Sequence, residues 1–519
     1  MTKRHNKITF KTYNMDQLSL PIQLDSLIPE NHLVRIVNST IENIDITPLI
    51  NKYKGGGTSS FNPVMMLKVI VYAYSQRIYS SRRIAKALRE NINFMWLSGG
   101  NKPDHRTINT FRSSIMKDVI DDVFASVVEF LVEEKYINFE NYFLDGTKIE
   151  ANANKYSHVW AKNTKRYKNN TQDKVKELLE HIDYENEKEN KIYGDNDLEE
   201  LGNDSEITSE KLENIVKDID EKLSKKPDNK KLAKIKKSLE KDYIPKIKKY
   251  EEQETILNGR NSYSKTDKDA TFLRMKDGGD KNSQTRPGYN IQAGTENQFV
   301  IGYSIHQRAG DTGCLIPHLN KLENLLGCLP ENIITDAGYG SEENYEYIEE
   351  KQLGNYVKYN TFYLEEIGKI KNEIFKLENF EYDNQKDEFT CPNGNKMVFK
   401  YIKNITTENG YETERRVYEG SGCNKCNLKD MCTKSKSNRT IEISFKLNDF
   451  KETAKNNLCS EKGIELRKKR SIDVESVFGR VKNNWGFKRF FLRGVEKINI
   501  EMGLLFTAHN LAKLQTALK

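Results

Sequence analysis

The chain has 519 residues, of which 36% are hydrophobic and 31% are charged, and its formal net charge is +7. Domains usually contain about 100–200 residues, so this length excludes a single compact core and predicts two to four units. No stretch approaches the roughly 18 uninterrupted apolar residues of a membrane span, and the N-terminal residues lack the pattern of a secretory signal. We therefore expect a cytoplasmic protein whose seven cysteines are reduced.

The first predicted unit, residues 1–138, is helical. An apolar helix begins with proline at 63–74, a basic helix follows at 81–90, and Asp104 has the character of a helix cap. Short helices with basic faces suit a helix-turn-helix DNA reader, but they suit any small helical bundle equally well. We predict a DNA-binding domain here. Its candidate DNA contacts are His105, Arg106 and Arg112.

An α/β pattern occupies residues 139–160 and 263–365. A strand from Asn141 is expected to end at Asp145 and to be followed by a turn. Downstream, a short buried strand ends at Asp336. Three antiparallel strands are expected between these two, at 272–276, 288–294 and 299–306.

Two insertions interrupt this pattern. Residues 161–262 are rich in charged residues, and their apolar residues recur at three- and four-residue steps, which predicts a coiled-coil type helical hairpin with Pro227 and Asp228 at its turn. The second insertion, 366–462, holds, besides Cys459, a group of four cysteines that could close a tetrahedral structural zinc site. The alternative is four reduced thiols packed in an insertion. The cysteines are Cys391, Cys423, Cys426 and Cys432.

Three carboxylates stand out. Asp145 and Asp336 each follow an apolar strand directly, and Glu475 lies beside the buried stripe of a predicted helix. Taken singly, each aspartate is better explained as a turn former, with the next glycine supplying positive φ, and Glu475 as an exposed acid. Together at one sheet edge, they would make a two-metal Mg²⁺ site. Glu475 can then point at the sheet while Arg480 and Lys482 point elsewhere.

The charge is concentrated near the C-terminus. Residues 461–497 contain eleven Lys or Arg and five acids, an excess that suits a polyanion, although a solvated helix face is the simpler explanation of an average charge run. Beside the third carboxylate, such cations would hold a DNA backbone. The candidate DNA-binding residues are Arg470, Arg480, Lys482, Lys488, Arg489 and Arg493.

In these motifs the chain resembles the DDE transposases of bacterial insertion sequences, most closely the group named insertion sequence 1182. The resemblance covers nearly the whole chain. It rests on the segments Phe61–Val69, Asp145–Ala153, Pro287–Gln292, Asp336–Ser341, Arg470–Lys482 and Gly486–Gly494.

The resemblance implies an RNase H-like (retroviral-integrase-like) core, completed by residues 463–519. Asp145, Asp336 and Glu475 would be its catalytic residues and would bind two Mg²⁺ or Mn²⁺ ions, with Asp145 bridging both. Lys482, seven positions after the glutamate, would contact the transposon end. Related families place an arginine four positions before the glutamate, whereas here that position is Ser471 and Arg470 lies one step earlier.

The implied activity is metal-dependent cleavage of double-stranded DNA at terminal inverted repeats, followed by attack of the freed 3′-hydroxyl on target DNA. A homodimer is expected because two ends must be paired, and the protein would act on the bacterial nucleoid when bound to DNA. Three alternatives remain open: a catalytically inactive DNA-binding remnant, an RNase H-like nuclease without strand transfer, and a zinc-stabilised structural protein.

Overall fold

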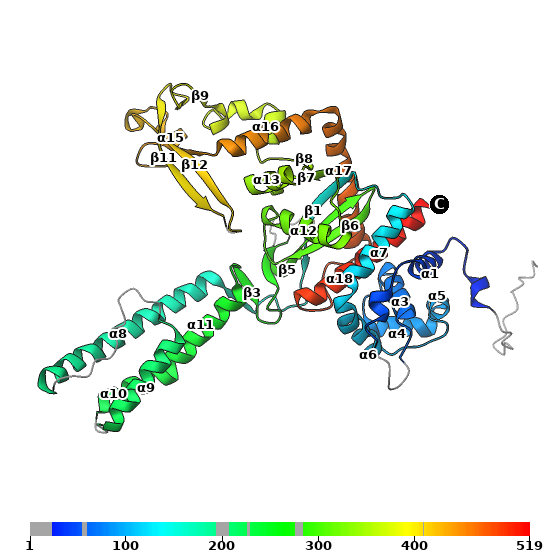
Figure 1. The fold of residues 1–519 in the computed structure, drawn as a ribbon, viewed down its shortest axis with the longest axis horizontal. Helices are drawn as coiled ribbons and strands as arrows, with labels where there is room; N and C mark the ends of the chain where they lie inside the picture. The colour runs from blue at the N-terminus through cyan, green and yellow to red at the C-terminus, as the bar shows by residue number, and fades with distance from the viewer. Residues whose placement is uncertain are drawn as a thin grey trace, which may run out of the picture.

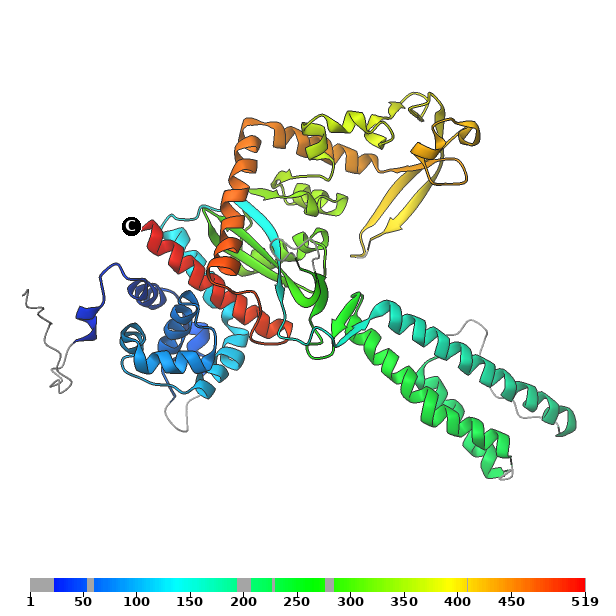
Figure 2. The same ribbon diagram turned by 180° about the vertical axis from the view of Figure 1, so that it is seen from behind.

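The computed structural model describes residues 23–53, 60–193, 207–225, 229–275, 284–407 and 409–518. These form an N-terminal helical bundle, a central sheet with helices on its faces, a long helical arm and a second sheet (Figures 1 and 2). Within the described ranges, no helix is long and apolar enough to cross a membrane.

The N-terminal bundle begins its helices where side chains cap them. Asn62 accepts a hydrogen bond from the Val64 amide at the start of the proline-initiated helix, and Asp104 accepts one from the Thr107 amide at 2.8 Å. Both predicted helix starts are therefore confirmed. The helices are α1 (Leu33–Asn43), α2 (Thr47–Ile50), α3 (Pro63–Ser75), α4 (Ser81–Glu90), α5 (Ile92–Leu97), α6 (His105–Thr110) and α7 (Ile120–Glu133).

The central sheet is mixed. Strand β1 pairs antiparallel with β5 and parallel with β7; β5 also pairs with β4 and β6, and β7 pairs in parallel with β8. The predicted antiparallel strands and the short buried strand are confirmed. The strands are β1 (Asn141–Glu150), β4 (Thr271–Arg274), β5 (Thr285–Glu296), β6 (Phe299–His306), β7 (Asn332–Thr335) and β8 (Gly354–Val357).

Strand β1 does not end at Asp145, as the sequence predicted. It continues to Glu150, because β5 pairs with it along this whole stretch, from Asp145 opposite Ala293 to Glu150 opposite Gly288. The long partner strand thus supplies hydrogen bonds to the backbone that a turn would otherwise leave exposed.

Helices cover the sheet and connect it to the bundle. Helix α17 (Glu461–Gly479) contacts β1, β5 and β7, whereas α18 (Val495–Ala517) contacts β6 as well as α3 and α7 of the bundle. Helix α18 is buried nearly all round, which explains its continuous apolar sequence. The remaining core helices are α12 (Leu315–Leu326) and α13 (Glu342–Glu350).

Within the described residues the helical arm contains four helices, whereas the sequence predicted a hairpin of two. The apolar residues expected to form the hairpin stripe do pack together, and Val175 of the long α8 joins the same core. The predicted turn at Pro227 and Asp228 lies outside the described residues. A short ribbon of β2 (His158–Trp160) and β3 (Ser262–Ser264) closes the base of the arm. Its helices are α8 (Ala161–Tyr193), α9 (Ser209–Lys225), α10 (Lys230–Ser238) and α11 (Ile244–Leu257).

The second sheet is antiparallel, with the order β13-β12-β11-β10-β9. Helix α16 (Phe445–Cys459) leads from it back to the central sheet and contacts β8 and α13 (Figure 1). The other elements of this region are α14 (Phe362–Glu366), β9 (Glu381–Asp383), β10 (Glu388–Thr390), β11 (Lys396–Thr406), β12 (Glu412–Gly420), α15 (Lys429–Cys432) and β13 (Thr440–Ile443).

Candidate active site

Asp145 and Asp336 lie on neighbouring strands of the central sheet. The parallel register aligns Phe143 with Ile334, so Asp145 falls beside Asp336, the residue directly after β7. The two side chains are close enough to interact, because the charge of Asp336 raises the pKa of Asp145. The fold thus brings together two of the three predicted catalytic carboxylates.

The Asp145 carboxyl has a pKa raised to about 6. Burial is the main cause; Arg470 opposes it, whereas the negative charges of Asp336 and Asp311 add to it. One Asp145 oxygen accepts a hydrogen bond from the Gly146 amide at 2.7 Å. A carboxylate that is crowded by other acids gains from a nearby cation, which is the property expected of a metal ligand.

Asp336 also makes the hydrogen bond of a turn former, whereas Asp145 lies inside β1. Asp336 Oδ1 accepts from the Gly338 amide at 2.9 Å, which leaves Oδ2 outside that bond. The expected positive φ of the following glycine is wrong at both positions, because neither Gly146, which lies inside β1, nor Gly338 has a positive φ. A Cβ at Gly146 would instead lie 2.5 Å from Gln292 Nε2 and 2.6 Å from Asp311 Oδ1. The glycine is needed because side chains approach the backbone closely there.

Asp311 is a carboxylate of this site that the sequence prediction missed. It lies between β6 and α12, and its Oδ1 accepts hydrogen bonds from Asn290 Nδ2 at 2.7 Å and Gln292 Nε2 at 2.9 Å. Its charge also raises the pKa of buried Tyr339. Because Asp311 precedes a helix and follows no strand directly, the strand-end pattern could not identify it.

Glu475 lies on α17, the helix that crosses the sheet at β1. Its side chain is 54% exposed and faces Asp145 across the guanidinium of Arg470. Asp473, two residues earlier, is buried and holds the helix in place, since its Oδ1 accepts from Thr295 Oγ1 at 2.6 Å and from the Gln298 amide at 2.9 Å. The third predicted carboxylate is therefore near the first two but separated from Asp145 by an arginine.

Arg470 connects the carboxylates. Nη1 lies 3.4 Å from Asp145 Oδ2, Nη2 lies 3.4 Å from Glu475 Oε1, and the side chain is only 13% exposed. Placed five positions before the glutamate, this arginine lies on the side of α17 that faces the sheet. Its guanidinium supplies the positive charge between the two acids.

The donor set suits a hard divalent cation, because carboxylate oxygens are the ligands that Mg²⁺ prefers. Within the described ranges, however, no three His, Cys, Asp or Glu side chains form a group that could hold a metal ion. Glu475 can join Asp145 and Asp336 only if Arg470 leaves the space between them.

Lys358 is a second residue that the prediction missed. It follows β8, the next parallel strand, and its pKa is lowered by burial and by the nearby charges of Arg470 and Arg467, while Asp336 opposes this shift. Lys358 follows a short strand directly, as Asp336 does, and this position is the sequence signal that could have identified it.

Of the predicted DNA-binding residues, Lys482 lies closest to the carboxylate strand. It was expected to point away from the sheet, but its Nζ donates to Thr147 Oγ1 and to the Lys148 carbonyl, both at 2.9 Å. The π-helical turn Arg480–Asn484 follows α17 and turns the chain toward β1.

The basic loop after this turn runs along the end of β1. Glu150 O accepts from the Phe490 amide at 2.9 Å, and the loop continues past residues 151–153. Arg489 and Arg493 donate to backbone carbonyls of that stretch, while Lys488 is exposed. These cations therefore border the carboxylate strand in space, although they lie far from it in the sequence.

Two other candidate DNA contacts point inward. Arg112 is 3% exposed and donates to the Tyr79 carbonyl at 2.6 Å, so it supports the bundle, and its selection as a surface contact was wrong. Arg480 is half-buried on the side of α18, where burial lowers its pKa. His105 and Arg106 line an open groove beside α4 and the basic loop.

Two parts of the chain match protein-family models. Residues 390–515 match a family described as Transposase DDE domain, and residues 22–114 match one described as Transposase domain (DUF772). The chain carries a transposase DDE domain. The transposase assignment implies DNA binding, and the DDE domain implies an RNase H-like core, phosphoryl transfer and a divalent metal. No curated protein and no solved structure matches the chain.

The DDE-domain match covers Glu475, Lys482 and the basic loop, whereas Asp145 and Asp336 lie outside both matched ranges. The matched transposase regions thus include the helix that carries the third carboxylate. The pairing of that helix with the two aspartates comes from the fold.

Proposed function

We propose that this protein is an insertion-sequence transposase of the insertion sequence 1182 group, which cleaves DNA at the element's ends and joins those ends to target DNA. The observation that carries this proposal is the meeting of Asp145 and Asp336 on adjacent strands, with the Glu475 helix packed across them. The two transposase-domain matches support the same assignment from independent segments of the chain.

Asp145, Asp336 and Glu475 would hold two Mg²⁺ or Mn²⁺ ions, which supply a nucleophile and charge stabilisation for displacement at phosphorus. Arg470 covers Asp145 and Glu475 in the DNA-free protein and would move onto the DNA backbone as the carboxylates turn to the metals. Asp311 keeps Gln292 and Asn290 oriented beneath the site and adds to its negative charge.

A series of basic residues supports double-stranded DNA as the substrate. It leads from Lys482 along the loop with Lys488 to a groove of about 570 Å³ between that loop and the N-terminal bundle. Cations along such a path would neutralise successive phosphates, while the bundle would read the inverted repeats. The groove-lining residues include Arg82, His105, Arg106, Asn109, Phe491 and Leu492.

The test is a cleavage and joining assay with DNA that ends in the inverted repeats flanking the gene, in Mg²⁺ or Mn²⁺. The wild-type protein should nick the repeat end and join it to target DNA as a dimer, whereas Glu475→Gln should bind without cutting. Cleavage without joining would favour the nuclease alternative. Binding without cleavage in either metal would favour the alternative of a catalytically inactive DNA-binding remnant.

Asp311→Asn should slow cleavage about tenfold or more and raise the metal concentration needed for half-maximal rate. The variant keeps the side-chain shape but removes one negative charge from the site, and a tenfold change corresponds to about 1.4 kcal/mol of barrier. Rates measured across a Mg²⁺ titration check this. An unchanged metal dependence, with Asp311→Ala equally active, would show that Asp311 takes no part in the reaction.

Lys488→Ala should weaken DNA binding and make it less dependent on salt. Losing one phosphate contact reduces the slope of log K against log salt concentration by about 0.9. Fluorescence anisotropy at several salt concentrations measures this slope. Lys217→Ala, an exposed lysine on α9 of the arm, is the matched control and should leave the slope unchanged; equal slopes for both variants would remove Lys488 from the DNA path.

A further inference from the structure

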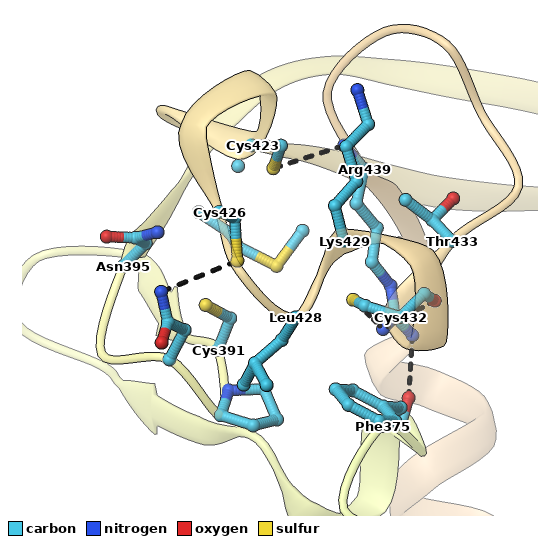
Figure 3. A pocket seen from close by; sticks show the side chains of 14 residues that line it. Phe375, Cys391, Asn395, Cys423, Cys426, Leu428, Lys429, Cys432, Thr433 and Arg439 are labelled. Carbon is cyan, nitrogen blue, oxygen red and sulfur yellow. Dashed lines mark hydrogen bonds between the residues drawn. The ribbon is translucent and has the colours of Figure 1, made fainter.

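The four cysteines of the second sheet region line one small cavity. It has a volume of about 30 Å³ and lies where the chain leaves β10 and β12. Figure 3 shows the thiols of Cys391, Cys423 and Cys426 on one side of this cavity, with Cys432 opposite them beside Arg439. All four are free cysteines, with no disulfide between them.

Hydrogen-bond donors face three of these sulfurs. The Arg439 amide donates to Cys423 Sγ at 3.5 Å, Arg439 Nη1 donates to Cys432 Sγ at 2.9 Å, and Asn393 Nδ2 donates to Cys426 Sγ at 3.4 Å. A thiol is a weak acceptor, whereas a thiolate is a charged one. Donors directed at metal-binding side chains are the usual outer layer of a metal site.

The segment that carries three of the cysteines has little else to hold it. Residues 421–439 contain no buried residue, and the apolar core of the sheet beneath them is small. Modules with small cores generally need a disulfide or a structural metal to keep one conformation. Here the four thiols come together from both ends of the segment and from the end of β10, beside apolar side chains such as Met397 and Leu428.

The charge of the segment also suits a metal thiolate. Zn²⁺ with four thiolates carries two net negative charges, and residues 421–439 contain five Lys or Arg and one acid, Asp430. Arg439 in particular contacts two of the sulfurs. Cations at this position would offset the negative charge of a metal thiolate.

We propose that Cys391, Cys423, Cys426 and Cys432 bind one structural Zn²⁺ that holds residues 421–439 against β10. As drawn, the cysteines do not form a metal-binding group among the described residues. Closure requires the side chains to change rotamer and Cys432 to exchange its contact with Arg439 for the metal. Cys391 and Cys423 each begin a tight turn. The Gly394 amide donates to the Cys391 carbonyl, and the Cys426 amide donates to the Cys423 carbonyl. Both cysteine side chains line the cavity.

The metal content of the full-length protein tests this site without using catalytic activity. Protein purified without chelator should contain one zinc per chain by mass spectrometry, and Cys426→Ser should lose it. Cys459→Ser, an exposed cysteine of α16 outside the cavity, is the matched control and should keep it. Asp145→Asn should keep it as well, which separates this site from the carboxylates.

Cobalt substitution of the wild-type protein removes the risk that a serine variant simply misfolds. Four thiolates around Co²⁺ should give intense visible bands and sulfur-to-metal charge transfer. Removal of zinc by a chelator should also make residues 421–439 the first site of limited proteolysis. The proposal is overturned if the wild-type protein neither contains zinc nor takes up zinc or cobalt, or if Cys426→Ser retains full zinc content.

Discussion

Asp145→Asn should abolish cleavage and joining while leaving DNA binding intact. The substitution preserves shape but removes the ionised oxygens that would bind the metals, and metal catalysis contributes several kcal/mol of transition-state stabilisation. At about 1.4 kcal/mol per tenfold, a loss of about 10³-fold or more is expected. Asp336→Asn should behave in the same way, because the register places it beside Asp145.

The fold should tolerate this change. Burial raises the pKa of Asp145 to about 6 although Arg470 and the Gly146 amide oppose this shift, so the ionised carboxylate does not stabilise the folded protein. End-labelled DNA on denaturing gels measures cleavage, and thermal unfolding checks the fold. Asp173→Asn, an exposed aspartate on α8, is the control that should keep full activity. Residual cleavage within tenfold of wild type would exclude Asp145 as a metal ligand.

Glu501→Ala should produce the largest loss of stability among single substitutions of acids. Glu501 is fully buried in α18, where Oε2 accepts from the amides of Phe491 and Leu492, each at 2.9 Å. The charge of Arg112 acts on the same carboxyl and lowers its pKa against the effect of burial. Removing the acid leaves a buried guanidinium without its counter-charge, which costs about 3–5 kcal/mol.

Urea unfolding followed by circular dichroism measures that loss. The control is Glu496→Ala, which removes an exposed acid from the start of the same helix, where it pairs with Lys117 at 2.8 Å. Exposed pairs contribute at most about 1 kcal/mol, so this control should shift the midpoint little. If both variants unfolded at the same urea concentration, Glu501 would not anchor the basic loop to the helical bundle.

The sequence identified the strands of the sheet better than it identified their spatial neighbours. Asp336 follows a short buried strand as predicted, because apolar runs bounded by turn residues leave few alternatives. The length of β1 was predicted wrongly because it depends on β5, a strand far along the chain. Asp311 was missed for the same reason: its place beside Gly146 arises only when β5 and the β6–α12 loop come together.

The sequence pattern predicted the direction of one side chain of this region correctly and that of another wrongly. Helical periodicity placed Glu475 beside the buried stripe, which fits its position near Asp145. The same periodicity sent Lys482 away from the sheet, but a π-helical turn begins at Arg480 and redirects the lysine onto β1. A wider turn of this kind has no simple signature in residue spacing.

The two-stranded ribbon at the base of the helical arm has a consequence for how the protein folds during synthesis. Strand β1 emerges from the ribosome before the arm, and both of its partners, β5 and β7, emerge after it. The arm's helices form a core of their own and can pack before the sheet is complete, and pairing of β2 with β3 then brings the two ends of this long insertion together. The entropy cost of closing this long loop is therefore incurred before β1 is paired. When β5 is synthesised, it already lies close to β1.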